Sequence, residues 1–241
     1  MSGTRDAGGA GAGAETPVPW LDRLAHDLRG PLSPLQTASH LLQHEGLEPA
    51  RRQELLQLLD RQARRMARML EELEDWVRAG QGRLLGPREA CEPALLLDYA
   101  LVGAGLAGTP VDDDGAIATI DADPHRLTQL LRTLLDYAVA HGGPPALRLR
   151  SDADRVRIEA TLPGTPPAAD ALDTLLDERE AEPYDQGLGL RLPLARRIAR
   201  AHGGELAATI GDDGRLLLAC DLPLSALSAG AAPPGSPSAS P

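Results

Sequence analysis

Two long amphipathic segments near the start of the chain constrain its fold most strongly. From Pro17 to His44 leucine and alanine side chains recur every three or four residues, and the pattern resumes from Arg51 to Ala79. This spacing predicts two α-helices, each with one apolar face. Each helix would have about 28 residues and a length of roughly 40 Å. An antiparallel pair of that length leaves apolar surface exposed, so we expect it to dimerise into a four-helix bundle.

The pattern changes after GQGRLL (80–85), which ends the second helix. Helical spacing returns over three shorter segments, 93–105, 124–142 and 189–204, and Asp123 stands at the N-cap position of the middle one. Short apolar or alternating runs predict strands over 116–121, 146–151, 156–162, 205–210 and 215–224. The last two runs flank GDDG, a typical hairpin turn.

Together these segments predict an α+β protein in two domains. The first is a helical hairpin over 17–80, and the second is an α/β sandwich over 86–225. Residues 1–16 and 226–241 are rich in Gly, Ala, Pro and Ser, so we expect both to be disordered tails.

Composition and charge indicate which classes of partner and which cellular compartment are expected. The net charge is −11, which leaves no excess of Lys and Arg to neutralise phosphates, so nucleic acid is not expected as a partner. No run of about 18 apolar residues is present, and the N-terminus lacks the pattern of a signal peptide. With only two cysteines, far apart in the chain, we predict a reduced, cytoplasmic protein without a membrane span.

The first helix contains LAHDLRGPLSPL (24–35), in which His26 and Asp27 are followed by Pro31. This stretch resembles the H-box of two-component sensor histidine kinases. DADPHRLTQLLRTLLDYAVAHGG (121–143) resembles the N-box helix of the same family, and GLGLRLPLARRIARAHGGEL (187–206) resembles its G2 box. The resemblance extends over nearly all of 17–225. It implies a dimerisation and phosphoacceptor bundle followed by an ATP-binding domain of the histidine-kinase type.

The resemblance gives His26 and Asp27 catalytic roles. It implies that the neutral imidazole of His26 attacks the γ-phosphoryl group of ATP in line. Asp27 can accept a proton or hold the ring in the required tautomer. The alternative for such a pair is a histidine on the solvent face of a helix beside an incidental acid.

The nucleotide-binding motifs depart from the family pattern at two of three anchors. Tyr137 stands where the N-box has its Mg²⁺-binding Asn, and a phenol is a poor ligand for a hard cation. In the stretch that corresponds to the G1 box, Leu162 replaces the Asp that receives the adenine amino group, Pro166 replaces one Gly, and Gly164 remains. A buried amine left without an acceptor costs about 1–3 kcal/mol. The resemblance implies ATP with Mg²⁺ as the cofactor, and these changes put its binding in doubt.

Four residues remain as candidate nucleotide contacts. Gly187 and Gly189 can let backbone N–H groups approach phosphates at the start of a helix, and Gly164 belongs to the same expected site. Arg132 can reach phosphates from the N-box helix. The alternatives are that the glycines only shape a turn and that Arg132 is solvated. No residue is predicted as a metal ligand.

The resemblance therefore implies a signalling protein with an intact phosphoacceptor and a degenerate ATP-binding domain. We predict that His26 accepts a phosphoryl group and passes it to the Asp of a response regulator's receiver domain, with a partner histidine kinase as a further donor. One alternative is an active cytosolic histidine kinase in which Asp136 and Asp170 compensate for the lost anchors. The other is a scaffold or inhibitor of a two-component pathway, in which no phosphate moves.

Overall fold

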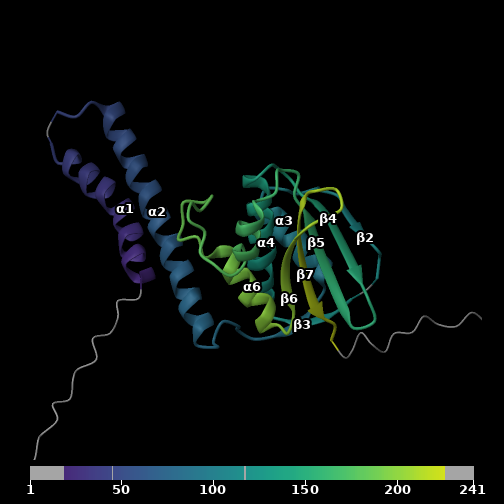
Figure 1. Ribbon diagram of the computed structural model, residues 1–241. Coiled ribbons are helices and arrows are strands. Elements are labelled where there is room, and N and C mark those ends of the chain that lie inside the picture. Colours follow the sequence, from purple (N-terminus) through teal and green to yellow (C-terminus); the bar gives the residue numbers. More distant parts are fainter. Residues whose placement is uncertain (1–18, 45, 117, 226–241) are drawn as a thin grey trace, which may run out of the picture. The chain divides into compact units, whose positions relative to one another are not determined.

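The computed structural model describes residues 19–44, 46–116 and 118–225. The tails expected at 1–16 and 226–241 lie outside these ranges. The chain forms two compact units that meet after Met66, and each is considered by itself (Figure 1).

Two long helices form the amino-terminal part of the chain, as the leucine spacing predicts. Helix α1 runs Pro19–Leu42 and contains both prolines, and helix α2 runs Pro49–Gly80. In the first unit, Leu24 and Ala38 of α1 and Leu55 of α2 are buried. The second helix ends in GQGRLL as expected. Its last turns, from Ala67 onward, belong to the second unit.

The second unit is a mixed α/β arrangement around a five-stranded sheet. Along the sheet the strand order is β2-β4-β5-β7-β6, and only the β2–β4 pair is parallel. Strands β1 and β3 form a separate antiparallel pair. The bounds are β1 Glu89–Cys91, α3 Pro93–Gly103, β2 Val111–Asp113, β3 Ile120–Ala122, α4 Pro124–Ala140, β4 Ala146–Ser151, β5 Arg155–Thr161, α5 Ala169–Thr174, α6 Arg191–Ala201, β6 Glu205–Ile210 and β7 Leu216–Pro223.

The core lies between the sheet and helices α4 and α6, which cover one of its faces (Figure 1). Helix α4 buries a stripe at helical spacing, and β5 and β7 bury alternate residues against it. The chain has no Phe, so aliphatic side chains fill this layer. The stripe and its main partners are Leu127, Leu130, Leu131, Leu134, Leu135, Val156, Ile158, Ala160, Leu218 and Leu222.

A buried histidine ties the start of α4 to the end of α6. The side chain of Asp123 caps α4 by accepting from the backbone N–H of Arg126 at 3.1 Å, as predicted. His202 Nε2 accepts from the backbone N–H of Asp123 at 3.0 Å, and its Nδ1 lies 2.8 Å from the carbonyl oxygen of Ile198. Burial lowers the pKa of His202, which favours the neutral ring that both contacts require. These bonds fix the two helices that carry the candidate site.

Four short elements differ from the sequence prediction. The strand expected over 116–121 is wrong in extent, because β3 begins only at Ile120. Strands β1 and β2 and helix α5 were not predicted. Three-residue strands are too short to show alternation, and β1 and β2 exist through pairing with β3 and β4. Among the helices described, none is both long enough and apolar enough to cross a membrane.

Candidate functional site

The predicted phosphoacceptor lies on an open surface of α1. The side chain of His26 is 85% exposed, so an approaching protein can reach its ring. Its Nδ1 lies 3.3 Å from Oδ1 of Asp27. A proton on Nδ1 would be donated to this carboxylate, which leaves the lone pair of Nε2 directed away from Asp27. The two residues predicted to act together are therefore in contact.

The loop that contains the predicted phosphate contacts Gly187 and Gly189, residues 185–190, is here called the glycine loop. The backbone of this loop binds the side chain of Glu72 from α2. The backbone N–H groups of Leu188 and Leu190 donate to Oε2 of Glu72, at 3.1 and 3.4 Å. Gly187 makes this approach possible, because a Cβ at this position would collide with Oε1 of Glu72. The amides at the start of α6 are thus engaged by a carboxyl group of the same chain.

Acidic groups are concentrated around this contact. Burial, and after it the negative charge of the neighbouring Asp185, raises the pKa of Glu72 to about 7. Burial, followed by Asp185 and Glu72, likewise raises the pKa of Glu180 to about 7. Two guanidinium groups lie beside the loop: that of Arg191 of α6, 3.1 Å from Asp136 and 3.5 Å from Asp185, and that of Arg179, whose Nε donates to the carbonyl oxygen of Leu188. Carboxyl groups therefore outnumber the guanidinium groups beside the glycine loop.

An aromatic cluster occupies the end of α4 that the resemblance assigns to Mg²⁺ binding. Tyr137 is buried, stacks on His141 with ring centroids 4.0 Å apart, and meets Tyr184 edge to face at 5.7 Å. Burial raises the pKa of Tyr137 to about 12, so its phenol stays protonated at neutral pH. Leu162 is also buried, within the apolar core. Neither side chain offers the polar contact that the family motif supplies.

The other glycines have packing roles within the chain. A Cβ on Gly164 would overlap the carbonyl oxygen of His141, so the strand-end loop can rest on α4 only with glycine there. Gly189 adopts φ +76°, and a Cβ there would press on the backbone of Glu180. As arranged here, the residues at the expected nucleotide contacts engage one another.

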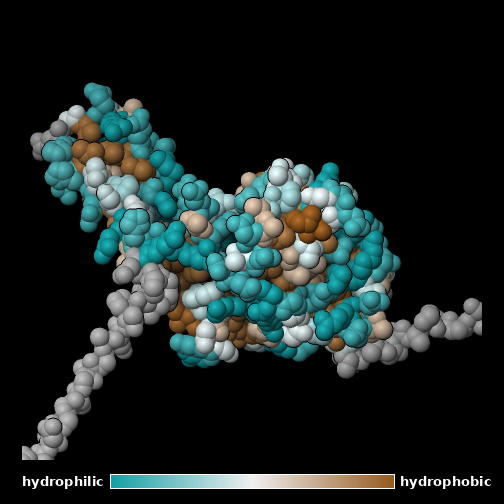
Figure 2. All heavy atoms as spheres, in the orientation of Figure 1, coloured by the Kyte–Doolittle hydropathy of each residue, from teal (hydrophilic) through white to brown (hydrophobic). Residues whose placement is uncertain are grey.

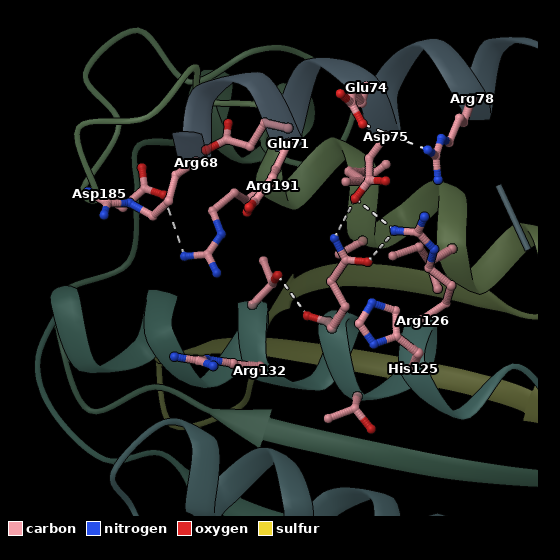
Figure 3. Close-up of a pocket in the computed structure, with 17 residues that line it drawn as sticks. Arg68, Glu71, Glu74, Asp75, Arg78, His125, Arg126, Arg132, Asp185 and Arg191 are labelled. Carbon is pink, nitrogen blue, oxygen red and sulfur yellow. Dashed lines mark hydrogen bonds and ion pairs between the residues drawn. The ribbon is translucent and has the colours of Figure 1, made fainter. Parts of the chain in front are cut away.

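A cleft of about 640 Å³ opens within the second unit between the last turns of α2, helix α4 and helix α6 (Figure 3). One wall is fixed by Asp75, whose Oδ2 accepts from Nη1 of Arg126 at 2.7 Å and from Nε2 of Gln129 at 2.8 Å. Nε of Arg126 donates to the carbonyl oxygen of Leu84 at 3.0 Å. Arg132, a predicted nucleotide contact, is half exposed and lies 3.7 Å from Asp136. The guanidinium of Arg132 is therefore already paired with the carboxylate of Asp136.

The sequence predicts a site at the glycine loop, but it does not predict that the side chain of Glu72 binds there. Glu72 belongs to the acidic run EELED of α2, for which the sequence predicts no contact. One signal was present: Glu72 lies three residues after Met69 and four before Trp76, in register with the buried side of α2. Tyr184 was missed because the segment before the glycine loop has no periodic pattern. Within 19–44, 46–116 and 118–225, no group of three or more His, Cys, Asp or Glu side chains is arranged to hold a metal ion.

Family models match both parts of the chain. The His Kinase A (phospho-acceptor) domain matches residues 20–82, and the Histidine kinase-, DNA gyrase B-, and HSP90-like ATPase matches residues 122–225. The adaptive-response sensory kinase SasA of Synechocystis sp. is 29% identical over 209 residues, which cover 77% of this chain and 54% of SasA. The histidine-protein kinase AfsQ2 of Streptomyces coelicolor is 27% identical over 227 residues, which cover 83% of this chain and 40% of AfsQ2. The chain thus spans about half the length of the curated relatives it matches.

Solved structures share the fold at low sequence identity. The histidine kinase AdeS of Acinetobacter baumannii superposes with a TM-score of 0.62 at 16% identity, over 83% of this chain and 98% of AdeS. The histidine kinase ThkA, solved in complex with the response regulator protein TrrA, gives a TM-score of 0.66 at 16% identity, over 86% of this chain and 62% of ThkA. With a phospho-acceptor helical region followed by a histidine-kinase-type ATPase domain, the chain belongs to the two-component sensor histidine kinase family.

Proposed function

We propose that this protein transfers phosphoryl groups in two-component signalling, with His26 as the carrier and a receiver-domain aspartate as the exchange partner. The observation that carries the proposal is the exposed imidazole of His26 in contact with Asp27, inside a matched phospho-acceptor domain. The proposed source of the phosphoryl group is another phosphorylated protein, either a receiver or a partner histidine kinase.

The transfer can be written with the atoms at hand. Nε2 of His26 attacks the phosphorus of an aspartyl phosphate, the N–P bond forms, and the O–P bond breaks. The leaving group is the receiver's carboxylate. The proton on Nδ1 passes to Asp27 or to water, so the phosphorylated ring becomes neutral. Forward transfer to a receiver reverses each step.

Three contacts support a source other than ATP. Tyr137 fills the place of the expected Mg²⁺ ligand, and Leu162 offers no acceptor to adenine. The amides of the glycine loop hold Glu72. A nucleotide would have to displace this carboxyl group and still lack two of its usual contacts.

We further propose that the protein acts as a homodimer in the cytoplasm. Large apolar side chains exposed on the long helices, including Leu32, Leu56, Leu70 and Val77, support burial against a second copy. Figure 2 shows apolar side chains in brown on the helical hairpin. The response-regulator complex of ThkA supports a receiver domain as the second partner.

The direct test starts from the receiver side. Receiver domains from the same genome are each phosphorylated with ³²P-labelled acetyl phosphate, purified, and mixed with this protein. We expect acid-labile label to appear on this protein with at least one receiver, because a phosphoimidazole is acid-labile. Failure of all of them to transfer label would contradict the proposed exchange.

Docking of the receiver is expected beside His26, where Leu28 lies half-buried on the same helix. Leu28→Glu should slow transfer by about tenfold or more, because a carboxylate would lose its water at the interface. The rate of label transfer measures this. Gln36→Glu is the control, since it adds the same charge at an exposed position of α1. Equal rates for both variants would place the docking face elsewhere.

An active kinase is the second candidate, and the family match of the ATPase domain favours it. The histidine kinase ShkA, solved in complex with AMPPNP, shares the fold with a TM-score of 0.56 at 22% identity, over 87% of this chain and 46% of ShkA. Under this function the protein would label itself on His26 from γ-labelled ATP with Mg²⁺.

A further inference from the structure

One face of α2 carries three side chains that contact three different parts of the second unit. Glu72 binds the glycine loop, Asp75 pairs with Arg126 of α4, and Trp76 lies under the guanidinium of Arg197 of α6, 3.6 Å from the ring centroid. Residues at positions i, i+3 and i+4 share one helix face. A rotation of α2 about its axis would therefore change all three contacts together.

The Glu72 contact has a distinct geometry. Its side chain is buried at 8% exposure, and one carboxyl oxygen accepts from both Leu188 and Leu190. N–H groups at the start of a helix lack partners within the helix and carry partial positive charge. Gly187 leaves the room that the carboxyl group needs. Glu72 therefore takes the N-cap donor of α6, Leu190, which would otherwise be offered to an anion from solution, together with the loop donor of Leu188.

We propose that Glu72 is a releasable latch: its carboxyl group holds the amides of Leu188 and Leu190, and its withdrawal frees the glycine loop from α2. The latch goes beyond phosphoryl transfer and does not depend on it, because its atoms differ from those of His26 and Asp27. Each proposal can fail alone.

The charges that face Glu72 make the closed latch sensitive to its protonation. From the segment before α6, Asp185 and Glu180 approach it with negative charge. From α6, Arg191 opposes them, but Asp136 of α4 shares that guanidinium. Four carboxyl groups, those of Glu72, Glu180, Asp185 and Asp136, thus share the charge of Arg191. A neutral Glu72 suits the closed latch, and an ionised Glu72 loosens it.

The sign of the pH effect follows from the raised pKa. The ordinary pKa of Glu72 is 4.5, and burial in the closed latch raises it to about 7. Closing therefore takes up a proton. The stabilisation is complete below pH 4.5 and is lost as the pH rises through 7. Between pH 6 and pH 8 the closing equilibrium should fall about tenfold.

Amide hydrogen exchange at Leu188 and Leu190 measures directly how far the latch is closed. Protection factors, corrected for the intrinsic exchange rate, are compared at pH 6 and pH 8 in the whole protein. We expect them to fall about tenfold with rising pH in the wild type. In Glu72→Gln the side-chain oxygen still accepts both bonds and cannot ionise, so protection should stay high at pH 6 and fall less by pH 8 than in the wild type, because only Glu180 still ionises there. In Glu72→Ala protection should be low at both.

Asp60→Ala is the matched control, because it removes a carboxylate from an exposed position of the same helix. It should behave like the wild type. Equal protection in Glu72→Ala and the wild type at pH 6 would overturn the latch. So would low protection in Glu72→Gln at pH 6, and this variant decides the matter if Glu72→Ala does not fold.

Discussion

Replacing His26 with alanine is expected to abolish transfer of labelled phosphoryl groups from a receiver, a loss of at least about a thousandfold in rate. The methyl side chain has no lone pair to form the N–P bond. The measurement follows acid-labile label on the protein over time, with the same phosphorylated receiver as donor. The circular dichroism spectrum should not change, because the side chain of His26 is 85% exposed.

His40→Ala provides the matched control for this experiment. His40 lies in the last turn of α1 and is exposed, so its loss removes an equal side chain from the same helix. We expect its transfer rate to equal that of the wild type. If His26→Ala still takes up label, the phosphoacceptor is another residue. If His26→Ala takes up no label yet keeps full activity in cells, the protein acts as a scaffold.

Replacing Arg126 with alanine is expected to destabilise the second unit by about 2–4 kcal/mol, a fall in melting temperature of about 4–16 °C for a domain of this size. The guanidinium lies 2.7 Å from Asp75, and the two side chains are 10% and 14% exposed. Burial raises the pKa of Asp75, but hydrogen bonds from Arg126 and Gln129 outweigh it and leave the pKa below its ordinary value. Removing the cation leaves a poorly solvated carboxylate and a carbonyl oxygen of Leu84 without its donor.

Thermal unfolding followed by circular dichroism measures this change. Arg132→Ala is the control on the same helix, because its side chain is 51% exposed and its ion pair is long at 3.7 Å. An exposed pair contributes little, so its melting temperature should stay close to that of the wild type. Equal melting temperatures for the two variants would show that the Arg126–Asp75 pair does not fix α4.

The parts of the fold that the sequence predicts are those with local signals. The leucine spacing of α1 and α2 and the stripe of α4 arise from helix geometry alone. The N-cap at Asp123 also follows from local chemistry, because a carboxylate that precedes Pro124 can reach the first free N–H groups. Strands β1 and β2 depend on partners distant in the sequence, so no local pattern marks them.

For the site, the sequence predicts which residue types are present, but not which distant residues contact one another. The contact between His26 and Asp27 can be predicted because the two residues are adjacent on one helix. The departures from the family motif at Tyr137 and Leu162 can also be recognised from the sequence, because the motif gives the residue expected at each position. That Glu72 binds the glycine loop requires two segments more than a hundred residues apart to meet, and only the folded chain brings them together.

The central claim is that His26 receives its phosphoryl group from another protein, and one labelling experiment tests it most directly. The purified protein is incubated with γ-³²P-labelled ATP and Mg²⁺, and in parallel with ³²P-labelled receivers. We expect acid-labile label on His26 only from a receiver, with none from ATP above the His26→Ala background. Label from ATP on the wild type alone would contradict the claim and show that the protein is an active histidine kinase despite Tyr137 and Leu162.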